Sequence, residues 1–266
     1  MIKRIVVGTA IAASGWAAYS SIRRWWATWG FDPVEAARTL PGDDLVAVPS
    51  ASETRGITIA APVDAVWPWL VQMGYGRGGW YSYDAMDMKG ASSEAILPEL
   101  QDLAVGDTVP TDPDGGFRVR ILEPMRALVL YADQDIVGER RPGAASTNAA
   151  TPGLALSGRF LQTATPPAFS ASWAFVLEPL DDGQTRLIER FRAGMDAASR
   201  ASAILAPVLG FGVFVMTRRQ MLGIKARAEK LARDRAMLHR DVDAIAERAM
   251  TAPVDVRSDD AVPARS

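Results

Sequence analysis

The chain has 266 residues, 48% of them hydrophobic and 23% charged, so it can bury a full core and should be folded over most of its length. A net charge of −2 gives no field that would gather nucleic acid, and we exclude that class of partner. The chain has no cysteine, which removes disulfides and zinc–thiolate sites, and its single histidine, His239, is expected at the surface. We therefore predict no metal and no cofactor.

The N-terminus reads as a membrane segment. Residues 5–22 carry no charge and meet the lower length limit for a spanning helix. Basic and aromatic residues flank this run, namely Lys3, Arg4, Arg23, Arg24, Trp25, Trp26 and Trp29. The tryptophans would sit at the membrane boundary, so residues 1–29 are predicted to be a transmembrane or signal-anchor segment. Basic residues on both sides leave the orientation undecided, and a cleaved signal peptide or a soluble amphipathic helix are the alternatives.

Residues 30–54 are predicted to be a linker that contains a short helix. Asp32 is a suitable N-cap, Pro33 suits the first helical position, and Glu35 is an acid in the first turn. Pro41 and Gly42 then end the helix.

The next part of the chain alternates like a β-sheet and ends in a long helix. Residues 169–180 and 185–193 predict the clearest hairpin, and the turn between them holds Asp-Asp-Gly-Gln. After the sheet, side chains on one helical face recur every three or four residues, at Val213, Met216, Gln220, Ile224, Ala228 and Leu231, and all of them except Gln220 are apolar. A helix with one apolar stripe after a series of hairpins is best buried on the concave face of the sheet.

Several motifs resemble the opening and the close of one superfamily. They are Ala61-Pro62, Ala65-Val66-Trp67, Gln72-Met73-Gly74, Trp173-Ala174-Phe175-Val176-Leu177 and Met221-Leu222-Gly223-Ile224-Lys225. Residues 55–231 thereby resemble the START/Bet v 1-like superfamily (SRPBCC), and most closely its polyketide cyclase/dehydrase-like branch. The resemblance implies an α+β helix-grip fold, in which a seven-stranded antiparallel sheet wraps around a long C-terminal helix. It also implies binding of hydrophobic ligands, with many different outcomes.

Two stretches interrupt or extend this domain. Residues 133–167 form a long insertion rich in small residues and proline, which we interpret as a lid or a disordered segment. Residues 232–266 should continue the helix as a charged extension with a disordered tail, and a protein partner would bind there.

The segment Gly74-Tyr75-Gly76-Arg77-Gly78-Gly79 has the spacing of a dinucleotide fingerprint. Here a helix precedes the glycines and an aromatic, strand-like segment, 80–83, follows them, which reverses the order that a nucleotide site needs. We predict a turn at the mouth of a cavity instead.

Nine residues are candidates to line a cavity between the sheet and the helix. They are Trp67, Trp80, Tyr83, Trp173, Phe175, Glu189, Phe191, Met216 and Gln220. Glu189 alternates with residues that face outward, so it would point into the cavity if the aromatic faces look inward. A buried carboxyl needs a partner or a raised pKa. The favoured interpretation is instead that Glu189 lies near the end of the strand, where an arginine pairs with it or solvent reaches it.

Three functions remain open. The first is membrane-tethered binding or transport of a hydrophobic molecule of the lipid, isoprenoid, quinone or polyketide type. The second is an aromatase/cyclase-like enzyme, for which the polar candidates are Glu189, Tyr83, Asp84, Gln220 and Arg218; none forms a motif, and we assign no catalytic residue. The third is a membrane-associated assembly factor with no ligand.

Overall fold

The computed structural model describes residues 14, 17, 19–87, 90–113, 115–133, 136, 169–195 and 200–251. The predicted insertion, 133–167, lies almost entirely outside these residues, as does most of the uncharged run, 5–22. The strands are β1 (Ala51–Ile59), β2 (Thr108–Pro110), β3 (Gly116–Glu123), β4 (Ala127–Asp133), β5 (Phe169–Pro179) and β6 (Thr185–Met195). The α-helices are α2 (Pro33–Ala36), α3 (Val63–Val71), α4 (Asp84–Asp87) and α7 (Arg200–Thr251), and short 3₁₀ turns are η1 (Asp43–Val46), η2 (Pro98–Leu100) and η3 (Asp181–Gly183).

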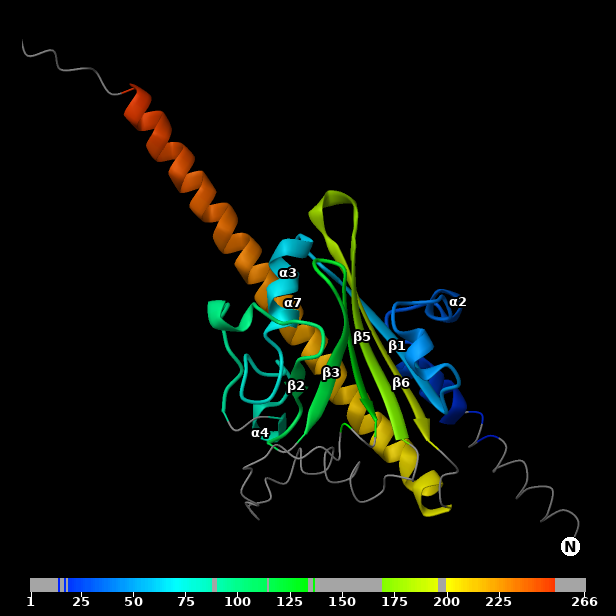
Figure 1. The fold of residues 1–266 in the computed structure, drawn as a ribbon. Helices are drawn as coiled ribbons and strands as arrows, with labels where there is room; N and C mark the ends of the chain where they lie inside the picture. Colours follow the sequence, from blue (N-terminus) through cyan, green and yellow to red (C-terminus); the bar gives the residue numbers. More distant parts are fainter. Residues whose placement is uncertain are drawn as a thin grey trace, which may run out of the picture.

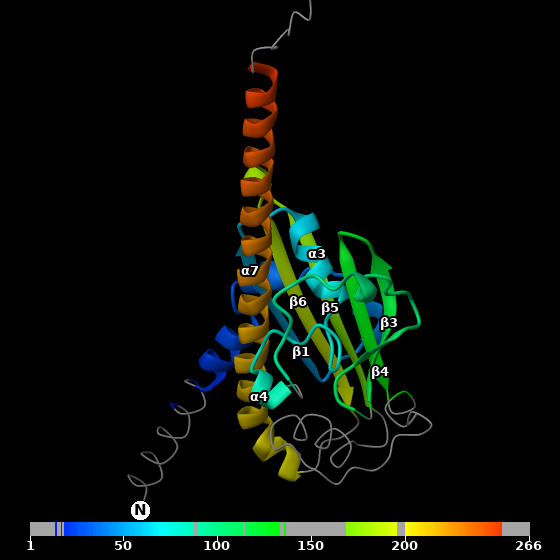
Figure 2. The same ribbon diagram turned by 90° about the vertical axis from the view of Figure 1, so that its left-hand side faces the viewer.

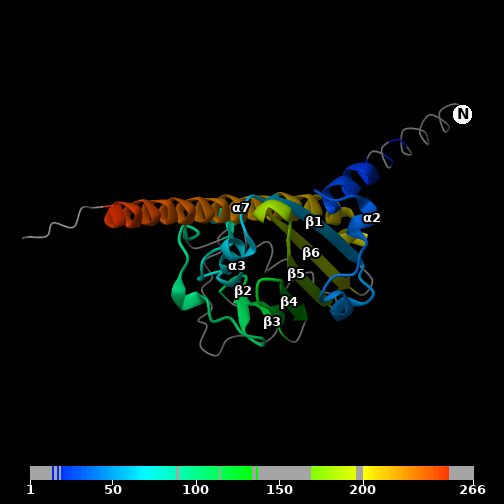
Figure 3. The same ribbon diagram turned by 90° about the horizontal axis from the view of Figure 1, so that it is seen from above.

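The strands form one antiparallel sheet in the order β1-β6-β5-β4-β3-β2. The first strand therefore pairs with the last, which brings residues more than 130 positions apart side by side, as at Arg55 and Glu189. The sheet curves around α7, which lies across its concave side (Figure 1, Figure 3). This is the predicted helix-grip arrangement.

Helix α7 is held to the sheet by its apolar stripe and by polar contacts. Ile224 and Ala228 of the predicted stripe are completely buried in the main core, together with Met221, which the prediction did not include, whereas Val213 is 43% exposed. The Lys225 ammonium donates to the Thr58 carbonyl oxygen at 2.6 Å, which fixes the helix against the end of β1. Beyond Ala232 the helix leaves the sheet and its side chains are exposed (Figure 2).

One glycine sets how closely α7 approaches the rest of the domain. A Cβ atom on Gly223 would lie 2.1 Å from the carbonyl oxygen of Tyr81, so only glycine allows this approach. Tyr81 is buried, and its hydroxyl donates to the Trp69 carbonyl oxygen at 3.1 Å. The contact thus joins α7, α3 and the loop after the glycine-rich segment.

The convex side of the sheet is covered by residues 30–50. Leu40 packs there on Ala127, Val176 and Ile188, with Phe31 at the edge. Arg190, only 3% exposed, ties this cover down. Its guanidinium donates to the Asp43 carboxylate at 2.6 Å, to the Arg38 carbonyl oxygen at 2.7 Å and to the Thr54 hydroxyl at 2.9 Å. Residues 30–50 are therefore a layer of the domain.

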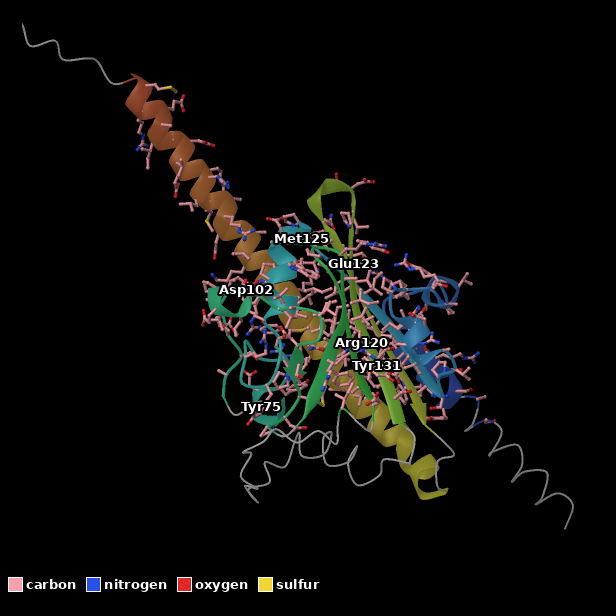
Figure 4. All side chains as sticks on the ribbon, viewed as in Figure 1. Tyr75, Asp102, Arg120, Glu123, Met125 and Tyr131 are labelled. Atoms are coloured by element: carbon pink, nitrogen blue, oxygen red, sulfur yellow. The ribbon has the colours of Figure 1, made fainter. Side chains whose placement is uncertain are left out.

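The edge of the sheet far from β1 is more open to solvent. There Arg120 on β3 lies 5.3 Å from the ring centre of Tyr131 on β4, a cation–π pair (Figure 4). Turns at this edge carry Met125 and Asp102.

The strand count differs from the expectation. The resemblance implied seven strands, whereas the described residues give a sheet of six, and the strand-like segment 80–83 is not one of them. Tyr81 has φ +57°, a left-handed conformation that extended strands do not contain. The glycine-rich segment before it closes as a tight turn, with a bridge between Gly74 and Gly79, both at positive φ. The prediction of a turn there is correct.

The N-terminal tryptophans also differ from the expectation. Residues 19–27 are helical and pack against the beginning of α7. Trp26 is buried, with its ring 5.5 Å from that of Phe211, and Trp29 is half-buried; Trp25 alone is strongly exposed. Among the described residues we find no helix that combines the length and the apolar character needed to cross a bilayer.

Candidate functional site

The concave face of the sheet is organised in rows across β1, β6, β5 and β4. Directly opposed residues in an antiparallel pair project from the same face, so the register places the members of each row together. The rows, in order from the end where α7 begins, are Ala51-Ala193-Ala171-Ala132, then Glu53-Phe191-Trp173-Leu130, then Arg55-Glu189-Phe175-Leu128, then Ile57-Leu187-Leu177. From one end of the concave face to the other, the rows thus consist of small side chains, then mainly aromatic ones, then a charged pair beside apolar ones, and finally apolar side chains alone.

Glu189 occupies the charged row and is 1% exposed. One carboxyl oxygen, Oε1, accepts a hydrogen bond from the Trp173 indole nitrogen at 2.8 Å. The other, Oε2, is buried and has no hydrogen-bond partner among the described residues. A buried acceptor left in this state costs roughly 1–3 kcal/mol, so it requires an explanation.

Burial raises the pKa of Glu189, because a charged carboxylate is poorly solvated there. The positive charge of Arg55 and the hydrogen bond from Trp173 both lower this pKa, without cancelling the effect of burial. The neighbouring negative charge of Glu53 adds to the increase. The site therefore favours the protonated acid, whose O–H can donate a hydrogen bond.

Arg55, directly opposite Glu189, is itself 1% exposed. Its guanidinium forms an ion pair with Glu53 and donates through Nε to the Trp26 carbonyl oxygen at 3.1 Å. It also lies 5.6 Å from the ring centre of Phe214 on α7. Arg55 thus links the concave face to the N-terminal helix and to α7, and its charge is committed mainly to Glu53.

Aromatic rings form the wall beside Glu189. Trp80 stacks on Trp173 with ring centres 5.2 Å apart and planes at 15°. Phe117, Phe175 and Phe191 contact the other sides of Trp173. Trp173 and Phe191 face the helix yet stay half-buried, while Phe175 is fully buried. This end of the interior is therefore less tightly enclosed than the apolar rows.

The structure brings five of the nine predicted residues together, namely Trp80, Trp173, Phe175, Glu189 and Phe191. The other four lie elsewhere. Trp67 is a buried core residue of α3, and Tyr83 is 41% exposed. Met216 is half-buried on α7, and Gln220 is buried, with its amide nitrogen 3.6 Å from the sulfur of Met73.

Sequence reasoning missed Arg55 and Glu53 as members of the site. A signal existed, because Arg55 has the same parity as Ile57 and Ile59 and must share their inward face. The favoured interpretation of Glu189, an arginine partner or access of solvent near the strand end, also needs correction. Glu189 is buried and accepts a hydrogen bond from Trp173, and the arginine opposite it is paired with Glu53.

A separate hollow of about 700 Å³ lies on the surface beside Tyr75, at the glycine-rich turn (Figure 4). Arg77, Asp107, Asp112 and Arg118 give it a polar lining. The Arg77 guanidinium is occupied by the carbonyl oxygens of Met73, Val71 and Leu100. None of the nine predicted residues lines this hollow, so it is distinct from the concave face.

No family model and no curated protein matches the chain. Solved structures do resemble it. A polyketide cyclase-like protein of Corynebacterium glutamicum is 14% identical, with 75% of this chain and 93% of that chain covered and a TM-score of 0.25. An aromatase/cyclase of a Streptomyces species is 15% identical over 70% and 95%, with a TM-score of 0.26. A conserved protein of Geobacillus kaustophilus is 16% identical over 68% and 96%, with a TM-score of 0.33.

These similar structures include proteins of the polyketide cyclase-like and aromatase/cyclase kind that the sequence resembles. At identities and TM-scores this low, the similarity adds nothing about substrate or reaction. The fold assignment rests on the strand order and the gripped helix, and the function must be argued from the concave face.

Proposed function

We propose that the chain binds a small, largely apolar molecule that carries a hydrogen-bond acceptor, such as a carbonyl or hydroxyl oxygen. The molecule lies on the concave face, with its apolar body against Trp173 and the alanine row and its acceptor at Glu189. The observation that carries the proposal is the buried Oε2 of Glu189, which has no partner among the described residues. With the proton of the acid on Oε2, this O–H would donate a hydrogen bond to the acceptor of the ligand, which would remove the cost of leaving the group without a partner.

The neighbouring rows support this choice of ligand. Ala193, Ala171 and Ala132 present only methyl groups in the row beside the aromatic one, so no large side chain of the sheet occupies the space in front of them. Trp173 and Phe191 supply flat apolar area next to it, and such walls with one polar group are typical of sites for small apolar ligands. The raised pKa of Glu189 favours an acceptor on the ligand over a cation.

We retain the predicted membrane tether as part of this proposal. Residues 5–22 would hold the chain at a membrane, which is where apolar ligands are found. The supporting observations are the uncharged run itself and its basic flanks.

The test uses Prodan, a fluorescent aromatic ketone whose carbonyl oxygen is an acceptor. Substitution Glu189→Leu removes the O–H donor and should weaken Prodan binding about tenfold, because a hydrogen bond to a buried group is worth about 1.5 kcal/mol. Glu189→Gln keeps a donor at the same place and should stay within about twofold of the parent protein. Glu178→Leu, on the opposite face of β5, is the matched control and should leave Prodan binding unchanged.

Equal Prodan affinity in Glu189→Leu and in the parent protein would refute the proposed site. An aromatase/cyclase-like enzyme is the second candidate, and the raised pKa of Glu189 favours it because a protonated acid can transfer its proton. An enzyme of this kind would lose turnover of a poly-β-keto substrate in Glu189→Gln while Prodan binding persists. A protein that only carries its ligand would transfer that ligand equally well as the parent protein and as Glu189→Gln.

A further inference from the structure

Positive charge is concentrated in two segments that are far apart in the sequence. Residues 1–31 contain four basic side chains and no acidic one, namely Lys3, Arg4, Arg23 and Arg24. Residues 200–228 contain five basic side chains and again no acidic one, namely Arg200, Arg218, Arg219, Lys225 and Arg227. The whole chain has a net charge of −2, so these two segments stand out against an acidic remainder.

The fold brings the described parts of these two segments into contact. Trp25 lies 5.4 Å from Phe214 between ring centres, Trp26 lies 5.5 Å from Phe211, and the Arg218 guanidinium lies 5.1 Å from the ring centre of Trp29. All three views show the N-terminal helix beside the beginning of α7 (Figure 1, Figure 2, Figure 3). The N-terminal helix and the part of α7 from Phe211 to Arg218 are therefore in direct contact.

This surface also exposes large apolar side chains. Ile22, Trp25 and Phe211 are 53%, 57% and 47% exposed, which is unusual for residues of this size. Arg23, Arg24, Arg218 and Arg219 are exposed in the same two segments. We call the set of Ile22, Arg23, Arg24, Trp25, Phe211, Arg218 and Arg219 the aromatic–basic face.

We propose that the aromatic–basic face docks on an anionic lipid bilayer, as a contact of the folded domain additional to the predicted N-terminal tether. The uncharged run, 5–22, ends at Ile22, inside the face, so a chain held by that run must bring the face to the bilayer surface. Tryptophan and arginine suit the boundary between acyl chains and headgroups. Each arginine near an anionic surface contributes about 1 kcal/mol. The inference does not depend on the ligand of the concave face.

The experiment uses the full chain, reconstituted in vesicles of phosphatidylcholine with or without phosphatidylserine. The absence of native cysteine allows one nitroxide label to be placed at will. Gly212→Cys puts the label on α7 next to the face, at an exposed position where an added Cβ meets nothing within 4 Å. His239→Cys puts it on the exposed extension of the same helix, about 40 Å away at 1.5 Å per residue.

Docking predicts that the label at 212 is reached by oxygen and shielded from a water-soluble nickel reagent in vesicles containing phosphatidylserine, while the label at 239 stays in water. Arg218→Gln/Arg219→Gln should lower the ratio of docked to undocked protein about thirtyfold, since two charges are lost. Arg233→Gln/Arg240→Gln, the same charge change on the extension, should leave that ratio unchanged.

Two results would overturn the proposal. One is that the nickel reagent reaches the label at 212 as readily as the label at 239 in anionic vesicles. This would mean that the run 5–22 holds the chain at the membrane without docking of the domain. The other is that the label at 212 is shielded from the nickel reagent in detergent, where the protein has the mass of a dimer. This would mean that the aromatic–basic face binds a second copy of the chain.

Discussion

Glu189 and Arg190 are neighbours on β6, and they show how differently the two faces of the sheet treat a buried charge. Arg190 points to the convex side, where residues 30–50 supply it with a carboxylate, a hydroxyl and carbonyl oxygens. Glu189 points to the concave side, where Trp173 donates a hydrogen bond to Oε1 and Oε2 has no hydrogen-bond partner among the described residues. The convex polar group is fully used by the fold, whereas the concave one retains binding capacity.

The largest effect is expected on the convex face. Arg190→Met should reduce the free energy of unfolding by roughly 3 kcal/mol, because the Asp43 carboxylate and several carbonyl oxygens lose their buried donor. Urea unfolding of the variant measures this loss. Arg126→Met, which removes an exposed ion pair with Glu123, is the control and should cost less than about 1 kcal/mol. Equal costs in the two variants would mean that Arg190 is not a structural clamp.

The second prediction tests whether the concave side is tightly fitted away from Glu189. Gly223→Ala places a methyl group against the Tyr81 carbonyl oxygen, and the resulting shift of α7 should cost about 1–3 kcal/mol. Gly212→Ala, in the same helix with open space around it, should instead stabilise the protein by up to about 1 kcal/mol. Thermal unfolding of both variants gives the comparison. A neutral Gly223→Ala would show that α7 is not held against the loop at Tyr81.

The smallest effect concerns Glu189 itself and depends on pH. Its pKa is raised in the folded protein above the ordinary 4.5, so the folded state holds a proton that the unfolded state releases. Its contribution to stability is therefore lost as the pH rises from about 4.5 through the folded-state pKa, and is constant below 4.5.

Glu189→Gln removes this titration. The variant should match the parent protein below pH 4.5 and become the more stable of the two as the pH rises, as followed by the urea midpoint. Glu178→Gln, a partly exposed acid of the convex face, controls for general charge effects. A stability difference that does not change with pH would mean that folding does not shift the pKa of Glu189.

Local pattern was sufficient for much of the fold. The hairpin of β5 and β6 and the apolar stripe of α7 follow from alternation and from three-and-four spacing, which depend on neighbouring residues alone. The same parity gave the inward face of Trp173, Phe175, Glu189 and Phe191. The same alternation predicts that Arg55 faces inward, because it has the parity of Ile57 and Ile59, although a charged residue is not expected on an apolar face.

Other features could not be read from local pattern. Residues 30–50 have the turn and capping signals of a linker, and only the matching apolar surface of the distant β4, β5 and β6 makes them a layer of the domain. The segment 80–83 has a strand-like composition, but the turn from Gly74 to Gly79 and the left-handed Tyr81 take it out of the sheet. Trp26 and Trp29 resemble a membrane belt until Phe211 and Phe214 are seen to pack against them.

The sequence by itself determined the hairpin of β5 and β6, the long helix α7 and which side of these strands is apolar, because side-chain direction is fixed by the local backbone period. The tertiary structure decided that β1 pairs with β6, and hence that Arg55 stands opposite Glu189 while its charge goes to Glu53. It also decided that Oε2 of Glu189 has no hydrogen-bond partner among the described residues. It brought the N-terminal helix and α7 into contact as well. Partners more than 130 residues apart are chosen by strand register and packing, to which no local pattern refers.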